Sequence, residues 1–296
     1  MNAQIAQSLF PDLDRPQTVP FREQLLKWIG NKQRFAAEII GHFPARFGTY
    51  YEPFIGSGAV LGTLAPQRAV AGDAYAPLIE IWQALKQSPD TVSEWYAERH
   101  GLIAELGKSE AYAAVRDAFN RAPNGADLLF LSRACYGGVV RFRKKDGFMS
   151  TPVGAHKPMP PETFRTRAHA WHERIREVDF INSDYRVLFD RAQSGDLIYC
   201  DPPYQDSQAI LYGAQAFRLP ELFDAIGRAK RRGVIVALSI DGTKKSGGNV
   251  VAIEPPSGLF AREQSVHCGR SMLRRFQMEG QSLESEEVSD RLYLTQ

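Results

Sequence analysis

The chain has 296 residues, of which 44% are hydrophobic and 24% charged, with a formal net charge of +2. This length and composition are typical of a globular protein with a substantial core and exclude a fibrous or largely disordered chain. The absence of a long apolar run argues against a membrane span. Three cysteines without C-x-x-C spacing indicate a reducing compartment and no zinc site. We therefore expect a cytoplasmic protein without a membrane partner or a bound metal.

Both end regions of the chain show the pattern of an α/β fold, in which short apolar strands alternate with amphipathic helices. Residues 1–20 are polar and contain prolines, so we expect a flexible arm. Helical spacing of apolar residues predicts helices at 32–43, 77–87 and 219–230. Apolar runs predict buried strands entering Tyr51 and at 70–73, 179–181, 196–200 and 233–239. One α/β domain is therefore predicted from residues 21–88 and 178–296.

Residues 89–177 interrupt this alternation and predict an inserted, mainly helical domain. Helical segments are predicted at 91–121 and 161–177. Between them, residues 141–154 predict a β-hairpin whose tip is Asp146-Gly147, a dipeptide typical of hairpin turns. His169 and His172 lie three apart without an accompanying carboxylate or cysteine cluster, so metal binding is not expected there.

A glycine loop, Glu52-Pro53-Phe54-Ile55-Gly56-Ser57-Gly58, follows the first predicted strand. Glycines spaced G-x-G let the backbone approach a ligand, and the next helix start offers free N–H groups. Because position 61 is leucine, the G-x-G-x-x-G dinucleotide fingerprint fits poorly. Asp73 ends the second predicted strand, where an acid can accept from ribose hydroxyls. Each signal alone is weak, but the ordered pair fits S-adenosylmethionine.

A second motif, Asp201-Pro202-Pro203-Tyr204, follows the predicted strand at 196–200. Proline donates no N–H, so Pro202 can direct its carbonyl outward without committing an amide. A carboxylate, a carbonyl and an aromatic ring together suit an exocyclic amino group on a planar heterocycle. Alone, the motif could equally be a Pro-Pro turn that ends a strand. The upstream glycine loop favours the functional interpretation.

With these motifs in this order, the chain resembles the alpha-class DNA adenine-N6 methyltransferases of the Dam type, found in bacteria and phages. The resemblance runs from about residue 27 almost to the C-terminus. Further segments that carry it are Lys27-Trp28-Ile29-Gly30-Asn31-Lys32, residues 128–138, residues 148–154, Asn182-Ser183-Asp184-Tyr185 and residues 270–294. It implies a Rossmann-like sheet that binds S-adenosylmethionine, and an inserted target-recognition domain carrying the hairpin. The implied reaction is methyl transfer to N6 of an adenine flipped out of double-stranded DNA.

The resemblance also implies roles for individual residues. Asp201 and the Pro202 carbonyl would accept from the adenine amino group, and Tyr204 would stack on the base. The residues expected to hold the cofactor are Trp28, Lys32, Phe54, Gly56, Ser57, Gly58, Asp73, Asp184, Tyr185 and Asp201. The residues expected to contact DNA are Lys27, Arg133, Arg141, Arg143, Lys144 and Lys145.

Charge is unevenly distributed along the chain. Residues 133–176 contain ten lysines and arginines against three acids, an excess that suits contacts with phosphates but also fits a solvated surface. Ser132 and Gly137 stand where the family usually has asparagines, and the loop of the predicted hairpin also differs. These departures leave the recognised DNA sequence open.

Several alternatives remain open at this point. The enzyme could be the modification half of a restriction-modification system with a cognate endonuclease, or an orphan or phage enzyme. We expect a monomer, since one unit can flip one base. An enzyme that methylates RNA or another amino group is one alternative, although D-P-P-Y favours adenine. A catalytically inactive DNA-binding relative is another.

Overall fold

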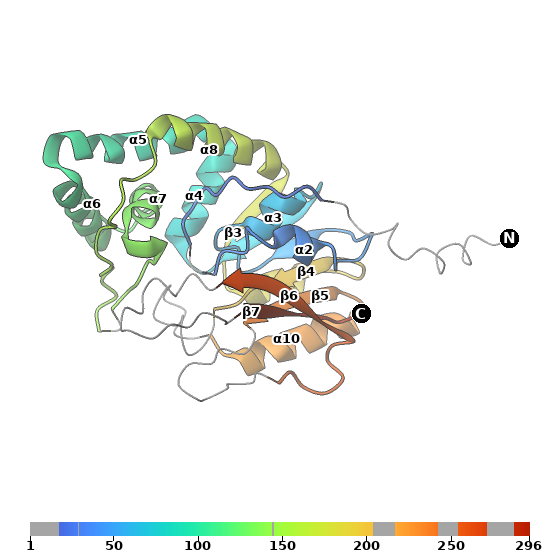
Figure 1. Cartoon of the computed structure of the whole chain (residues 1–296). Coiled ribbons are helices and arrows are strands. Elements are labelled where there is room, and N and C mark those ends of the chain that lie inside the picture. Colours follow the sequence, from blue (N-terminus) through green and yellow to red (C-terminus); the bar gives the residue numbers. More distant parts are fainter. Residues whose placement is uncertain (1–17, 29, 144, 204–216, 242–253, 271–286) are drawn as a thin grey trace.

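A computed structural model describes residues 18–28, 30–143, 145–203, 217–241, 254–270 and 287–296. A central sheet carries helices on both faces, and a helical lobe extends from one side of it (Figure 1). The predictions made for Tyr204, for Lys144 and for the arm up to residue 17 lie outside the described residues.

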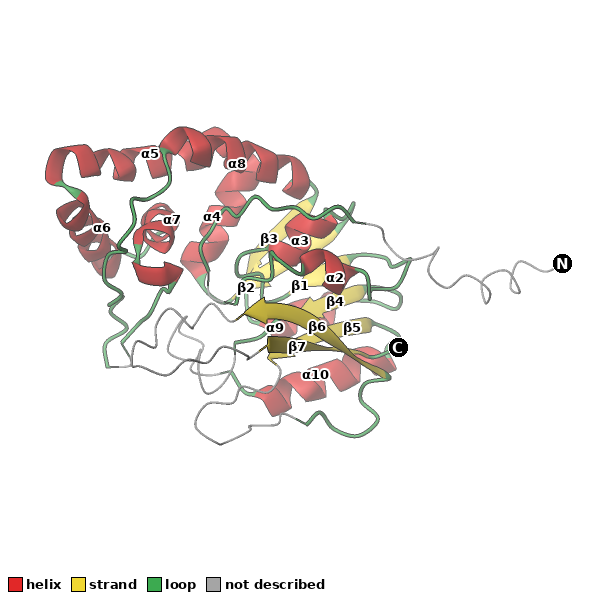
Figure 2. Cartoon of the chain, viewed as in Figure 1, coloured by secondary structure: helices red, strands yellow, loops and turns green. Residues whose placement is uncertain are grey.

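The sheet has seven strands within the described residues, in the order β3-β2-β1-β4-β5-β7-β6. They are β1 (Tyr50–Glu52), β2 (Ala69–Asp73), β3 (Val178–Asn182), β4 (Leu197–Cys200), β5 (Ile235–Asp241), β6 (Arg262–Arg270) and β7 (Glu287–Leu294). β1 to β5 pair in parallel, whereas β7 is antiparallel to both β5 and β6 (Figure 2). The prediction of an α/β, Rossmann-like sheet is confirmed. Strands are added to one side of the sheet from β1 to β3 and to the other side from β4 onward. Folds of the α/β class bind their ligands at such a switch in strand order, here between β1 and β4.

The strands of the central sheet are buried on both faces, which explains their continuous apolar sequences. In β4, Leu197 and Tyr199 pack into the core on one face, and Ile198 and Cys200 pack into the core on the other. This alternation follows from the two-residue period of a strand. β4 therefore joins both halves of the core, and its carboxyl end is held rigidly.

Most predicted helices occur with bounds close to those expected. The described helices are α2 (Ala36–Ile40), α3 (Ala59–Leu64), α4 (Ala76–Gln87), α5 (Pro89–Leu106), α6 (Lys108–Arg121), α7 (Gly125–Ala134), α8 (Pro161–Ile175), α9 (Tyr185–Arg191) and α10 (Leu219–Arg231), with a 3-10 turn η1 at Tyr136–Gly138. The segment predicted to be helical over 91–121 forms two helices, because Gly107 has a φ of 80° and separates α5 from α6. The helix predicted over 32–43 is much shorter than expected.

The inserted segment shares its core with the catalytic sheet. Tyr96 of α5 stacks on Phe164 of α8 with ring centroids 4.3 Å apart, and Trp171 of α8 contacts Trp82 of α4 at 5.1 Å. One hydrophobic cluster runs through all four residues and onto β1. The division into domains at residues 88 and 178 remains a prediction, but the packing between the two parts is continuous.

The chain doubles back in the segment predicted as a β-hairpin. The amide of Arg143 donates to the carbonyl of Phe148 at 2.9 Å, and that of Ser150 donates to the carbonyl of Arg141 at 2.9 Å. Gly147 has a φ of 66°, as expected of the second residue of an Asp-Gly turn. The pairing amounts to isolated bridges, such as Phe142 with Met149, rather than to long strands.

None of the described helices is both long enough and apolar enough to cross a membrane.

Two helical glycines provide a matched test of the packing between α3 and α8. A Cβ at Gly62 would lie 2.4 Å from the ring of Trp171, whereas a Cβ at Gly101 in α5 would meet nothing within 4 Å. We expect Gly62→Ala to lower the free energy of unfolding by about 1–3 kcal/mol, because Trp171 is fully buried. Gly101→Ala should raise it by about 0.5–1 kcal/mol, since alanine favours the helix. Urea unfolding measures both, and equal effects would contradict this account of the packing.

Candidate active site

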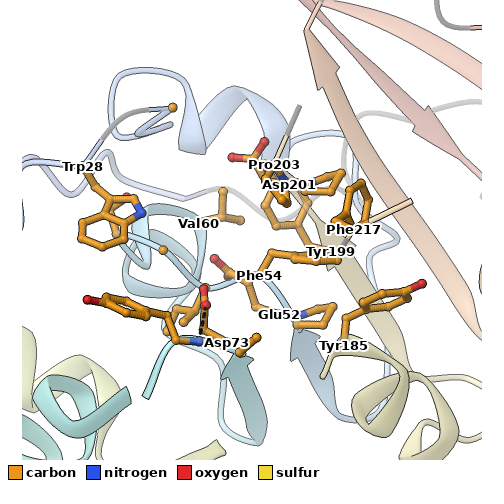
Figure 3. A pocket seen from close by; sticks show the side chains of 18 of the residues that line it. Trp28, Glu52, Phe54, Val60, Asp73, Tyr185, Tyr199, Asp201, Pro203 and Phe217 are labelled. Atoms are coloured by element: carbon orange, nitrogen blue, oxygen red, sulfur yellow. Dashed lines mark hydrogen bonds between the residues drawn. The ribbon is translucent and has the colours of Figure 1, made fainter. Parts of the chain in front are cut away.

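A cavity of about 320 Å³ lies at the carboxyl ends of the parallel strands. It is lined by the loop after β1, the end of β2, the end of β4, the start of α9 and Phe217. Figure 3 shows Trp28 and Asp73 toward one end, Tyr185 and Phe217 toward the other, and Asp201 and Pro203 along one side. Pockets of this size hold small organic ligands.

The glycine loop forms one wall of the cavity. Gly56 has a φ of 46° and Gly58 a φ of 64°, a backbone region that favours glycine. A Cβ at Gly56 would come within 3.2 Å of the buried Trp28 ring, and the Gly56 carbonyl accepts from Trp82 Nε1 at 3.2 Å. Ser57 is also buried and lines the cavity, whereas Gly58 caps α3 and is not among the lining residues.

Asp73 occupies the position predicted for it at the end of β2. Its carboxylate accepts from the backbone amide of Tyr75 at 3.0 Å (Figure 3). Burial raises the pKa of Asp73 to about 6, although hydrogen bonds from backbone amides oppose the shift. Tyr75 in turn contacts Phe142 of the hairpin edge to face, with ring centroids 5.6 Å apart. The hairpin and the cavity wall are thus in direct contact.

Three aromatic rings line the end of the cavity farthest from Trp28. Phe54 stacks on Tyr185 with ring centroids 5.2 Å apart, and Phe217 meets Phe54 edge to face at 5.7 Å. Flat apolar surfaces of this kind suit a planar heterocycle.

Asp184 caps the N-terminus of α9. It accepts from the Arg186 amide at 2.9 Å, and its carboxylate lies 2.7 Å from Nε of the Arg186 side chain. The hydrogen bond with that side chain lowers the pKa of Asp184. The Asp184 carboxylate, which the resemblance assigns to the cofactor, is therefore anionic and already engaged by Arg186.

Asp201 follows β4, and Pro202 and Pro203 line the cavity beside it. Its Oδ1 lies 3.0 Å from the ammonium nitrogen of Lys32. Lys32 is 4% exposed, and the same nitrogen is 3.2 Å from Asp290 Oδ2. Lys32, predicted as a cofactor residue, does line the cavity, and its charged partners include these two carboxylates.

Glu52 is fully enclosed at the end of β1 and accepts from the Tyr50 hydroxyl at 2.6 Å. Burial, helped by the nearby charge of Asp201, raises the pKa of Glu52 to about 8, although the hydrogen bond from Tyr50 opposes the shift. The side chain is thus a neutral acid over much of the physiological range. A neutral Glu52 and a lysine-paired Asp201 line the same cavity.

Comparison with known proteins identifies the family. Residues 28–222 match the model of the D12 class of N6 adenine-specific DNA methyltransferases. The chain belongs to this family.

It is 31% identical over 228 residues to a DNA adenine methylase of Vibrio cholerae, covering 72% of this chain and 79% of that protein. It is 28% identical over 265 residues to the DNA N-6-adenine-methyltransferase of Escherichia phage P1, covering 84% of this chain and 34% of the phage protein. A Type II methyltransferase of Lactococcus lactis, M1.LlaDCHI, is 26% identical over 226 residues, covering 72% of this chain and 79% of that protein.

The residues predicted to contact DNA are not all on the surface of this methyltransferase. Arg141, Arg143 and Lys145 are exposed on the hairpin, and Lys27 is exposed beside Gly138. Arg133 is only 6% exposed, and its guanidinium donates to the carbonyls of Gln24 and Leu25. A contact between Arg133 and DNA is therefore disfavoured, because the side chain is enclosed and holds the N-terminal segment in place.

Much of the basic excess predicted for DNA acts within the protein. Arg167 pairs with Glu23 at 3.0 Å and donates to the Gln24 carbonyl. Arg174 donates to the Gly62 carbonyl and lies over the Phe21 ring. The local sequence gives no sign of this use, since the partners lie more than a hundred residues away.

Several residues that line or adjoin the cavity were not predicted from the sequence to belong to the site. They are Glu52, Tyr75, Tyr199 and Phe217, with Asp290 just behind it. Glu52 stood inside the glycine motif and could have been found there as the acid that precedes the loop. Asp290 had no comparable signal, because β7 reaches this edge of the sheet only through antiparallel pairing.

Replacing Glu52 by glutamine tests its protonation. The folded protein holds the proton of Glu52 more tightly than the unfolded chain does, so stability falls as pH rises from about 4.5 to 8. Glu52→Gln removes this titration, so its stability relative to wild type should increase across that window, by up to roughly 1.4 kcal/mol per pH unit. Urea unfolding at several pH values measures the difference, with the exposed Glu94→Gln as a control. Parallel pH curves for wild type and Glu52→Gln would contradict the assignment.

Proposed function

We propose that this DNA adenine methyltransferase transfers the methyl group of S-adenosylmethionine to N6 of an adenine turned out of double-stranded DNA. One observation carries the proposal: the glycine loop, Asp73 and Asp201-Pro202-Pro203 all line a single cavity. A base inside a duplex cannot present its amino group to such a cavity, so the adenine must leave the stack.

The lining residues suit S-adenosylmethionine. Among the described lining residues, four carboxylates (Asp73, Asp184, Asp201, Glu221) outnumber three bases (Lys32, Arg186, Arg218), and Glu52 adds a neutral acid. When bound, S-adenosylmethionine supplies an electrophilic methyl group on a positively charged sulfur. An acidic cavity favours that charge. We assign Asp73 to the ribose hydroxyls, and Phe54, Tyr185 and Phe217 to the adenine ring of the cofactor.

Asp201 and Pro202 act on the target amino group. Its nitrogen is a poor nucleophile because the lone pair is delocalised into the ring. Acceptance of its hydrogens by the Asp201 carboxylate and the Pro202 carbonyl draws the lone pair back onto nitrogen and offsets the developing positive charge. A carboxylate has about four acceptor positions, so pairing with Lys32 leaves capacity for the base. The rigid end of β4 supplies the alignment.

We also propose how the enzyme contacts DNA and in which cellular setting it acts. Tyr204 stacks on the flipped base, and the exposed hairpin around Arg141 and Lys145 lies on the duplex. The enzyme acts as a monomer in the cytoplasm, where the DNA is accessible. Both an orphan role and pairing with a restriction endonuclease require this same reaction. Similarity to a Type II methyltransferase supports the second setting.

Asp201→Asn tests the reaction. The variant keeps the shape of the side chain but loses its charge, so methyl transfer should fall at least about a hundredfold. Long-read modification mapping of DNA from a methylation-free bacterial host should show methyladenine at one recurrent site for wild type and none for the variant.

Asp224→Asn, on the exposed face of α10, is the matched control and should methylate normally. Full activity of Asp201→Asn would refute the assigned role. If purified wild-type protein modified structured RNA but not duplex DNA, the RNA alternative would replace the proposal. Failure to bind S-adenosylmethionine by calorimetry would favour an inactive DNA-binding relative.

Variants of Arg141 and Lys145 distinguish recognition of the base sequence from contact with phosphates. Arginine can form paired hydrogen bonds with guanine, whereas lysine contacts phosphate as a point charge. Arg141→Ala should relax the recognised sequence, at a cost of about 1–3 kcal/mol for the cognate site. Lys145→Ala should weaken binding to all sequences alike and reduce its salt dependence. Binding to cognate and shuffled duplexes at several salt concentrations distinguishes them. Equal losses on both duplexes for Arg141→Ala would mean that the hairpin only clamps the backbone.

A further inference from the structure

A buried chain of charges runs from the sheet into the proposed active site. The Lys32 side chain is 5% exposed and has its ammonium nitrogen 3.0 Å from Asp201 Oδ1 and 3.2 Å from Asp290 Oδ2. The Asp290 side chain is 7% exposed, and Asp201 is 19% exposed. Asp201 and Lys32 line the cavity, whereas Asp290 is not among the lining residues. Among the described residues, Lys32 links Asp290 to the cavity.

Asp290 lies within a strand, whereas Lys32 and Asp201 lie in loops. Asp290 lies in β7 between two partner strands, opposite Asp241 of β5 and Val266 of β6. β7 runs antiparallel to β5, so its first half lies at the edge of the sheet where β4 ends. A shift of one residue in this register would turn the Asp290 side chain to the other face of the sheet. The pairing of β7 thus places a carboxylate behind Lys32.

A contribution to stability does not by itself explain why the fold buries an ammonium between two carboxylates. Removing an ammonium and two carboxylates from water costs several kcal/mol, and well-packed apolar residues of similar size often replace buried ion pairs without loss. An ammonium held between two carboxylates does have a geometric effect. It fixes the direction of the carboxylate that faces the cavity.

We propose that Asp290 is a positioning residue for methyl transfer, which holds the Lys32 ammonium and through it orients the Asp201 carboxylate toward the amino group of the target adenine. This inference rests on the proposed function, in which Asp201 accepts from that amino group. Asp290 touches neither the base nor the cofactor. Its contribution lies in the alignment of Asp201, so it affects the rate of the chemical step more than the binding of either substrate.

The test compares Asp290→Asn with Asp290→Glu and with a matched control. Asp196 is also a buried aspartate beside β4, but it lies at the opposite end of that strand and accepts from the Thr49 amide. Asp196→Asn should lower the melting temperature and leave kcat unchanged. Turnover is measured with radiolabelled S-adenosylmethionine and duplex DNA carrying the mapped site, at a temperature where every variant is folded.

We expect Asp290→Asn to lower kcat by about tenfold to a hundredfold, because a small misalignment of a reacting group has effects of this size. The Kd for S-adenosylmethionine, measured by calorimetry, and the KM for DNA should stay within about twofold of wild type. Asp290→Glu, which keeps the charge, should recover part of the lost kcat. A kcat for Asp290→Asn equal to that of wild type would overturn the inference. A raised Kd for S-adenosylmethionine with an unchanged kcat would also overturn it, because Lys32 would then act on the cofactor and not on Asp201.

The double variant Lys32→Met/Asp290→Asn covers the case in which Asp290→Asn does not fold. It removes the ammonium together with the carboxylate behind it, so it leaves no unpaired lysine in the core. A low kcat in this folded variant with an unchanged Kd for S-adenosylmethionine supports positioning. A raised Kd would assign Lys32 to the cofactor and overturn the inference, and a normal kcat per folded molecule would mean that the ion pairs are only structural. If wild-type protein methylates no DNA, the proposed function fails and the inference fails with it. Methylation by wild type together with full activity of Asp290→Asn would overturn the inference alone.

Discussion

The parallel pairing of β1 with β4 is the constraint on which the rest of the site depends. Tyr50 lies opposite Leu197 and Tyr51 opposite Ile198, so both strands end at the same edge of the sheet. The residues that follow, the glycine loop after β1 and Asp201-Pro202-Pro203 after β4, are separated by more than 140 positions in the sequence but line one cavity. From β1 the sheet extends through β2 and β3 to one side, and from β4 it extends through β5 to the other. This change in strand order opens a crevice for ligands between β1 and β4.

The inserted helices also contribute to this cavity. Arg133 of α7 donates to the carbonyls of Gln24 and Leu25, and Trp171 of α8 donates to the carbonyl of Glu23. The segment they hold leads directly to Lys27 and Trp28, and the Trp28 ring covers the glycine loop. The part of the chain that carries the proposed DNA-reading hairpin is thus the same part that fixes one wall of the cavity proposed to hold the cofactor. Continuous packing between α4 and α8 makes the two parts mechanically dependent.

The sequence predicted the elements that are decided locally. β4, α4 and α10 occur close to their expected bounds, because an apolar run or a helical period identifies each of them without knowledge of the fold. The motifs around Gly56 and Asp201 could likewise be found in the sequence, because each directly follows a predicted strand and contains residue types suited to binding a ligand. The role of Arg133 was not readable, because a buried arginine bound to distant carbonyls has the same local sequence as an exposed one. Asp290 was hidden for a similar reason: only the register of β7 brings it to Lys32. Long-range pairing is what the sequence pattern leaves out.

The electrostatics of the cavity follow from crowding several acids at one edge of a sheet. Carboxylates that are close together and shielded from water repel one another, and proteins relieve this by protonation or by pairing with a cation. Both solutions occur here. Burial leaves Glu52 protonated until about pH 8, with the Tyr50 hydroxyl as its hydrogen-bond donor. Asp201 is instead paired with Lys32. The two solutions are not interchangeable, because a protonated Asp201 would lose part of its capacity to accept from an amino group. The cation therefore has to stand beside Asp201, and the neutral acid can stand at Glu52.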